Sequence, residues 1–95
     1  MIELYELRQL AAFASAGTLL EAAEILHLSQ PALSRNMKKL EEDLGISLFE
    51  RSKNKLELNK NGEYALELAR KLLDDADSFI TRVRDFDRKS RTITL

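Results

Sequence analysis

Four stretches of the chain repeat apolar residues at spacings of three and four, which is the period of an amphipathic helix. The first stretch covers residues 3–16, and Gly17 follows it as a left-handed stop. A second helix is expected from residue 18 or 19 to about His27. It starts with the capping-box form Thr18-Leu19-Leu20-Glu21, and Ala22 and Ala23 give it a small-residue face for close packing.

The third stretch is residues 29–44, SQPALSRNMKKLEEDL. Its stripe of apolar residues consists of Leu33, Met37, Leu40 and Leu44. Ser29 is expected to cap the first turn, which also tolerates Pro31, and Gly45 is expected just past the end. Only two residues separate this helix from the preceding one, so the pair is predicted to cross steeply as a helix-turn-helix.

Residues 46–58, ISLFERSKNKLEL, predict a short hairpin. Leu48-Phe49 is an apolar pair, and Leu56-Glu57-Leu58 alternates as a half-buried strand does. The polar segment between them contains Asn54, which tolerates a positive φ at a turn.

The fourth stretch predicts a helix capped by Asn59 or Asn61 and extending to about Arg88. Three heptads of a and d positions run along it without a break, at Ala65, Ala69, Leu72, Ala76, Phe79, Val83 and Phe86. The rest of so small a domain is too short to cover this face, so its distal half is expected to bury against another chain. The alternative is a long helix packed back on its own domain. Residues 90–95, SRTITL, begin to alternate like a strand, as if a further domain started there.

Composition limits the chemistry that this chain can carry. The 95 residues are 44% hydrophobic and 33% charged, which suits one small helix-rich domain. There is no cysteine, and the single histidine, His27, is expected at a helix end beside the core, so no metal site or cofactor is predicted. Neither an export leader nor an apolar run of membrane-spanning length is present, and a cytoplasmic protein without a membrane partner is expected.

The distribution of charge is more informative than the net charge of −1. Residues 29–39 hold three bases and no acid, and residues 51–55 hold three more bases, whereas residues 1–28 hold four acids and one base. Two local basic patches suit a protein that presents one face to a polyanion. The acidic run Glu41-Glu42-Asp43 is expected to point away from that face, which limits contact to Ser29–Lys38.

Residues 29–51 resemble the LysR-type bacterial transcriptional regulators, through SQPALSR at 29–35, LEEDLG at 40–45 and LFER at 48–51. The resemblance extends through residues 7–13 and 17–23 on one side and 58–63 on the other. It departs at Leu19 and Leu20, in place of phenylalanine and a small hydroxyl residue, at Asn36 in place of glutamine, and at Asn59 in place of threonine. The resemblance implies a mainly α fold: a winged helix-turn-helix of three helices plus a β-hairpin wing, then a long dimerising linker helix.

The resemblance also implies which residues meet DNA. Gln30, Ser34 and Arg35 match family positions on the helix that reads DNA, and Arg and Gln can bond guanine and adenine in bidentate fashion. The full set of expected DNA-binding residues is Ser29, Gln30, Pro31, Ser34, Arg35, Lys38, Arg51, Lys53 and Lys55. For each charge the alternative is a solvated surface residue, and for the last three it is a hairpin edge that discourages strand pairing. For Asn36 and Lys39 both interpretations stay open.

The expected organisation is a DNA-binding domain over residues 1–59, a linker helix over 60–89 and the start of a truncated effector-binding domain over 90–95. The expected function is sequence-specific binding of double-stranded DNA, an interrupted palindrome, by a homodimer that uses the helix at 29–44 and the wing at 49–58. A small-molecule inducer is expected only in the missing C-terminal domain, and the full-length protein would be a dimer or a tetramer. The main alternative is a dimerising interaction module without a nucleic-acid role; no site for an enzyme is evident.

Overall fold

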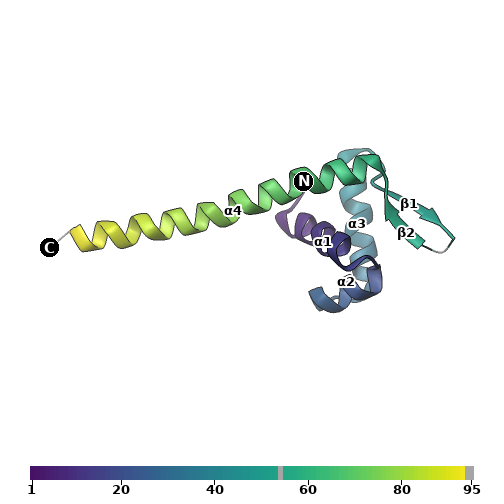
Figure 1. The fold of residues 1–95 in the computed structure, drawn as a ribbon, viewed down its shortest axis with the longest axis horizontal. Helices are drawn as coiled ribbons and strands as arrows, with labels where there is room; N and C mark the ends of the chain where they lie inside the picture. The colour runs from purple at the N-terminus through teal and green to yellow at the C-terminus, as the bar shows by residue number, and fades with distance from the viewer. Residues whose placement is uncertain (54, 94–95) are drawn as a thin grey trace.

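The computed structural model describes residues 1–53 and 55–93. Its elements follow in the order α1 (Leu4–Ala16), α2 (Leu19–Leu26), α3 (Gln30–Leu44), β1 (Phe49–Ser52), β2 (Lys55–Leu58) and α4 (Lys60–Ile93). The first three helices and the hairpin form a body at one end, and α4 starts on this body and projects from it (Figure 1). The molecule is therefore elongated, 65 × 26 × 21 Å. This architecture confirms the predicted winged helix-turn-helix with a long C-terminal helix.

Local capping interactions set the helix ends. The caps at Thr18 and Ser29 are as predicted, but only the Thr18 half of the expected Thr18–Glu21 capping box is formed, and a complete box lies at Glu3 and Glu6 instead. The Thr18 hydroxyl accepts a hydrogen bond from the Glu21 backbone N–H at 3.1 Å, and the Ser29 hydroxyl accepts one from the Ala32 N–H at 3.2 Å. Gly17 and Gly45 close α1 and α3 with φ angles of 90° and 74°. His27 closes α2 with a φ of 57°, but its side chain is exposed rather than placed beside the core.

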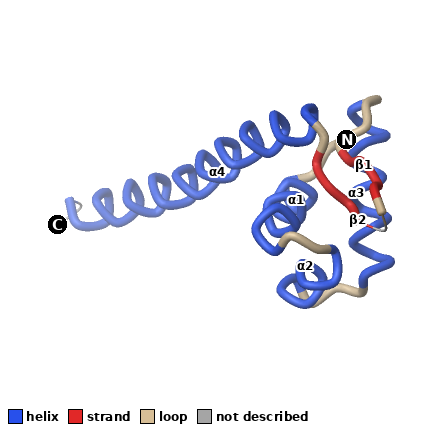
Figure 2. Tube along the Cα trace, turned by 45° about the vertical axis from the view of Figure 1, so that its right-hand side comes forward, coloured by secondary structure: helices blue, strands red, loops and turns tan. Residues whose placement is uncertain are grey.

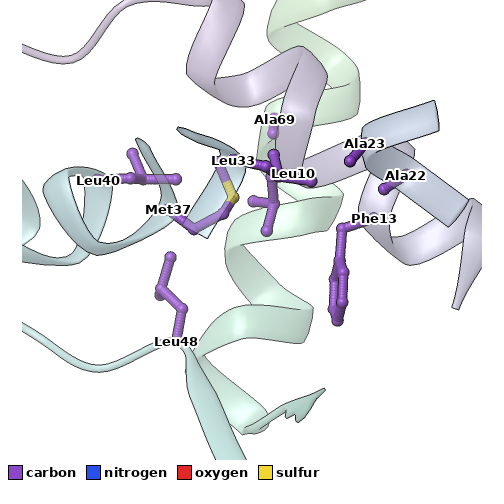
Figure 3. Close-up of a cluster of buried hydrophobic side chains, with 9 residues drawn as sticks. All are labelled: Leu10, Phe13, Ala22, Ala23, Leu33, Met37, Leu40, Leu48 and Ala69. Carbon is purple, nitrogen blue, oxygen red and sulfur yellow. The ribbon is translucent and has the colours of Figure 1, made fainter. Parts of the chain in front are cut away.

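The core lies where α1, α2 and α3 meet the start of α4 (Figure 3). Its buried apolar residues are Leu10, Phe13, Ala22, Ala23, Leu33, Met37, Leu40, Leu48 and Ala69. Phe13 also meets the wing, because its ring packs edge-on against Phe49 with centroids 5.4 Å apart. Leu44 was expected on the buried stripe of the third helix, but it is 41% exposed because the chain leaves the core in the last turn of α3.

The hairpin pairs β1 with β2 antiparallel, with Arg51 opposite Leu56 and Glu50 opposite Glu57. Because side chains alternate across a strand, the two faces of the hairpin differ. Phe49, Arg51, Leu56 and Leu58 share one face, and Glu50, Ser52, Lys55 and Glu57 share the other. Lys53 takes a positive φ of 49° at the turn, whereas Asn54, the residue predicted to do so, lies outside the described residues.

Helix α4 is capped by Asn59 rather than Asn61, since the Asn59 side-chain oxygen accepts the Gly62 N–H at 2.8 Å. The helix runs to Ile93, which corrects the end predicted near Arg88 and the strand-like interpretation of residues 90–93. A strand needs a partner strand for its backbone groups, whereas the helix satisfies them internally. An ion pair between Arg91 and Asp87, one turn apart at 3.1 Å, supports this last part of the helix. Residues 94 and 95 lie outside the described part.

The two halves of α4 have different surroundings. In the first half, Ala69 is 2% exposed, and Ala65 and Leu66 pack against the core. Helix α1 lies along this half (Figure 2), and Arg8 forms an ion pair with Asp77 at 3.9 Å. In the second half, Phe79 and Phe86 are 67% and 73% exposed. The expectation that this chain leaves the distal half of the helix uncovered is confirmed.

Candidate nucleic-acid interface

Helix α3 separates its buried and exposed residues onto opposite faces. Leu33, Met37 and Leu40 lie in the core, which turns the other side of the helix to solvent. That side carries Gln30, Pro31, Arg35 and Lys38, all exposed, with Ser34 half-buried between them. Most of these groups are polar or cationic and lie on one rigid helix face, preceded by Ser29, whose hydroxyl caps the helix N-terminus by accepting the Ala32 N–H.

A groove of about 300 Å³ separates this face of α3 from the wing, residues 49–58. Ser34 and Lys38 line it from α3, and Arg51 lines it from β1. Met37 and Phe49 are apolar lining residues of the two walls. The structure therefore brings together predicted residues from the helix and from the wing, 13 or more positions apart in sequence. Such a groove can accept a phosphodiester strand between two cations.

The three wing cations do not act as one patch. Arg51 faces α3, but Lys55 lies on the opposite face of the hairpin, where its ammonium group pairs with Glu57 at 3.5 Å. Lys53 is exposed at the turn. The sequence places these residues at alternate positions, and the register of the hairpin then assigns Arg51 and Lys55 to different faces. Of the three, Lys55 is the one turned away from the groove.

The adjacent lysines Lys38 and Lys39 also differ. Lys39 donates to the Asp43 carboxylate at 3.1 Å, one helical turn away, and this hydrogen bond together with the Asp43 charge raises the pKa of Lys39. The N-terminal ammonium group lies 3.9 Å from the same carboxylate. Lys38 instead lines the groove. A phosphate approaching Lys39 would meet Asp43 as well, which weakens its attraction.

The acidic end of α3 is only partly turned away from the groove. Asp43 is engaged with Lys39, but Glu41 lines the groove beside Lys38, contrary to the expectation. The Glu41 carboxylate accepts hydrogen bonds from the Leu48 N–H at 2.8 Å and the Ser47 hydroxyl at 3.1 Å. Its position follows from the loop after Gly45, which folds back onto α3, a contact that helical periodicity alone does not show.

The residues of the heptad stripe on α4 lie in two different environments. Ala65 and Ala69 pack against the chain's own core, and Ala76 is half-buried, so these three offer little surface to a partner. The outward stripe also contains Tyr64, which the sequence pattern missed, and Leu68, which was expected to widen the stripe beyond its a and d positions. It consists of Tyr64, Leu68, Leu72, Phe79, Val83 and Phe86, with exposures between 41% and 73%. The steps of four from Tyr64 to Leu72 were the signal for this second stripe.

Other kinds of site are not apparent in residues 1–53 and 55–93. No three or more side chains of His, Cys, Asp and Glu gather there in a way that could hold a metal ion. None of the helices in the same residues has both the length and the apolar character of a membrane span.

Comparisons with known proteins agree with this geometry. Residues 4–63 match the lysR family of bacterial regulatory helix-turn-helix proteins. The chain is 37% identical over 89 residues to the uncharacterized HTH-type transcriptional regulator YbhD of Escherichia coli, covering 94% of this chain and 28% of YbhD. It is 40% identical over 87 residues to the SDS degradation transcriptional activation protein of a Pseudomonas species, covering 92% of this chain and 28% of that protein. The chain thus spans less than a third of the length of these relatives.

Solved structures show the same fold. The crystal structure of the CbnR_DBD–DNA complex has a TM-score of 0.84 and 42% identity, and the match covers 88% of this chain and 97% of that one. The BenM_DBD complex with benA site 1 DNA has a TM-score of 0.84 and 33% identity over 90% of this chain and 99% of that one. Full-length CbnR, a LysR family transcriptional regulator, matches over 87% of this chain and 29% of its own length, with 42% identity and a TM-score of 0.82. From its helix-turn-helix to its long C-terminal helix, this chain belongs to the LysR family of bacterial regulatory helix-turn-helix proteins.

Proposed function

We propose that this chain is the DNA-binding part of a bacterial transcriptional regulator and that it binds a two-fold operator as a dimer. The observation that carries the proposal is the groove between α3 and the wing, because it places Lys38 and Arg51 on facing walls beside the polar face of α3. Helix α3 is then the recognition helix. The matching domains of CbnR and BenM were solved bound to DNA, which supports this assignment.

Base reading is assigned to the first two turns of the recognition helix. Gln30 and Arg35 are exposed there, and their side chains are suited to adenine and guanine edges in the major groove. Pro31 is exposed next to Gln30 and can lie against a thymine methyl group. Ser29 has its hydroxyl at the helix N-terminus, where the partial positive charge of the helix favours a phosphate.

Backbone contacts are assigned to Lys38, Arg51 and Lys53. All three are exposed, and the ion pairs recorded for the described residues involve none of them. A dimer would present six such cations, and each phosphate neutralised lowers the slope of log K against log salt by about 0.9, so a slope of about −5 is expected. Lys39 and Lys55 are left out of the set because their carboxylate partners would repel the same phosphates.

Dimerisation is assigned to the outward stripe of α4. A shallow groove of about 450 Å³ lies along it, lined in part by Phe79, Val83 and Phe86. Side chains of this size are seldom left in water as a continuous row, since burying one contributes about 1.5–3 kcal/mol. The same stripe on a second copy is a matching apolar surface.

Charge favours an antiparallel arrangement of the two α4 helices. Residues 63–77 hold five acids and two bases, and residues 78–91 hold two acids and five bases. A parallel pair would align like charges along its whole length, whereas an antiparallel pair sets each acidic half beside the partner's basic half. An antiparallel pair centred on Phe79 also places Leu72 opposite the partner's Phe86.

The remaining parts of the proposal concern the whole protein. The relatives are transcriptional regulators more than three times as long as this chain, and we propose that a further domain binding a small-molecule inducer completes the protein. A dimer is the minimal active form, and a tetramer is consistent with the same interface. Such a regulator acts in the cytoplasm at the nucleoid, and no catalytic activity is assigned to it.

Selection from a randomised double-stranded DNA library tests the proposal directly. The chain should enrich an interrupted palindrome, and its affinity for the enriched duplex should fall linearly on the log–log salt plot with the slope given above. Mixing the Leu72→Cys and Phe86→Cys variants tests the antiparallel pairing, because it should give disulfide dimers that contain one chain of each variant. The parental chain has no cysteine, so only the introduced residues can form disulfides. If no sequence is enriched and no DNA binding is detected even at low salt, the alternative remains that the chain is a dimerising interaction module without a nucleic-acid role.

A further inference from the structure

We infer that Glu41 is a positioning residue that sets the distance between the recognition helix and the wing. The inference rests on the proposed function, in which DNA occupies the groove between them. Glu41 lies on α3, one turn after Lys38, and lines this groove. A carboxylate beside a phosphate path opposes DNA binding by its charge alone. Its contacts give the reason for its presence there.

The Glu41 carboxylate holds the start of the wing. Its Oε2 atom accepts the Leu48 backbone N–H at 2.8 Å. The Ser47 hydroxyl has one proton and lies within donating distance of two acceptors, Glu41 Oε2 at 3.1 Å and the Phe49 carbonyl oxygen at 3.0 Å. A charged acceptor makes shorter and stronger hydrogen bonds than a neutral one. Leu48 immediately precedes β1, and its side chain is fully buried in the core. The contact therefore connects the recognition helix to the residue from which the wing begins.

The same two residues are held from the other side by the start of α4. The Leu48 carbonyl accepts the Asn59 backbone N–H at 2.9 Å, and the Ser47 carbonyl accepts the Asn59 side-chain amide at 3.0 Å. Asn59 also caps α4. Residues 47–48 are thus fixed between α3 on one side and the cap of α4 on the other, and β1 leaves this junction in one direction.

The direction of β1 decides where Arg51 lies. Arg51 is three residues beyond Leu48 and reaches the groove wall opposite Ser34 and Lys38. If the link to Glu41 is lost, the cap of α4 and the packing of Leu48 and Phe49 still hold the start of the wing, but the distance from α3 to the wing is set less tightly. Arg51 and Lys38 would then contact the backbone of the same DNA strand less often at the same time.

Two conservative substitutions separate position from charge. Glu41→Asp keeps the charge but shortens the side chain by one methylene, so its carboxylate no longer reaches the Leu48 N–H. Glu41→Gln removes the charge but keeps an oxygen at the same reach. A role in charge alone predicts that Glu41→Asp binds DNA like the parent and that Glu41→Gln binds more tightly. Positioning predicts weaker binding for Glu41→Asp, and binding at least as tight as that of the parent for Glu41→Gln, so the result with Glu41→Asp separates the two hypotheses.

The first measurement needs no DNA. In NMR hydrogen exchange, Glu41→Asp should speed exchange of the Leu48 amide by about tenfold, as expected when a hydrogen bond worth about 1.4 kcal/mol is lost. Glu41→Gln should change it by less than about threefold. Glu42→Asp and Glu42→Gln are matched controls, since Glu42 is the next carboxylate on α3 and is exposed. Unchanged Leu48 exchange in Glu41→Asp would overturn the inference even if no DNA ligand were found.

The second measurement uses the duplex enriched by the parental chain. Glu41→Asp should weaken binding about tenfold, and Arg51→Ala should weaken the parental chain and Glu41→Gln alike. In the Glu41→Asp background, the fold-change in affinity caused by Arg51→Ala should be less than about a third of the fold-change that it causes in the parental chain, because the wing is already misplaced. Equal effects of Arg51→Ala in both backgrounds would overturn the inference, whereas failure of the parental chain to enrich any duplex would overturn the proposed function instead.

Discussion

Gly62 gives the sharpest quantitative test of how the wing and the long helix are joined. It lies in the first turn of α4 with helical geometry, so helix propensity predicts that Gly62→Ala would stabilise the protein by about 0.8–1.0 kcal/mol. Packing predicts the opposite sign. A Cβ at this position would overlap the Leu48 carbonyl oxygen and lie 2.9 Å from Leu58 Cδ2, inside the 3.0 Å that real Cβ atoms essentially never cross.

The magnitude follows from what must move. Overpacking costs about 1–3 kcal/mol. Shifting Leu48 away from α4 also endangers the hydrogen bond from the Asn59 N–H to the Leu48 carbonyl and that from the Asn59 side chain to Ser47, each worth about 1 kcal/mol. After subtracting the gain in helix propensity, Gly62→Ala should destabilise the protein by about 2 kcal/mol. For a domain of this size that lowers the melting temperature by about 8–16 °C.

Thermal and urea denaturation followed by circular dichroism measure this change, at one fixed protein concentration because dimerisation shifts the apparent stability. Asn61→Ala is the matched control, since Asn61 is the exposed neighbour in the same helical turn and should change stability by less than about 0.5 kcal/mol. A Gly62→Ala protein at least as stable as the parent would refute the close contact between Leu48 and α4.

Three further predictions concern the recognition helix and the linker helix. Arg35→Ala should weaken operator binding by about 1–3 kcal/mol and relax the preference at one base position in a repeated selection. Unchanged specificity would mean that the proposed orientation of α3 on DNA is wrong. Lys38→Ala should make the salt slope less steep by about 0.9 per subunit, whereas Lys39→Ala, next to it but paired with Asp43, should change it less. Phe79→Glu should give a monomer in sedimentation equilibrium, while Thr81→Glu, on another side of α4, should stay dimeric; a dimer in both would exclude the outward stripe as the interface.

Several helix ends are features that the sequence alone determines. Thr18, Ser29 and Gly45 act within four residues of themselves, through a cap or a left-handed φ, so their roles could be read from the sequence. The order of elements and the polar outer face of α3 followed from such local signals and from helical periodicity. So did the family resemblance, which lies in a nearly continuous run of residues.

Periodicity could not decide which side of each element meets which neighbour. The a and d pattern of α4 grouped Ala69 with Phe79, but packing against α1 and the core buries the first and leaves the second exposed. The two residues lie about 15 Å apart along the helix axis, and the body of the domain covers only the nearer one. Residue spacing along one helix contains no information about where its neighbours end.

The groove between α3 and the wing also depends on contacts that the sequence does not show. The sequence by itself determined that Arg51 and Lys55 are cations in a hairpin and that Glu41 is an acid near the end of a helix. Only the tertiary structure decided that Arg51 faces the recognition helix, that Lys55 turns away to Glu57, and that Glu41 holds the Leu48 N–H. Strand register and the return of the loop onto α3 bring together groups distant in sequence, and their contacts exist only once the core is packed.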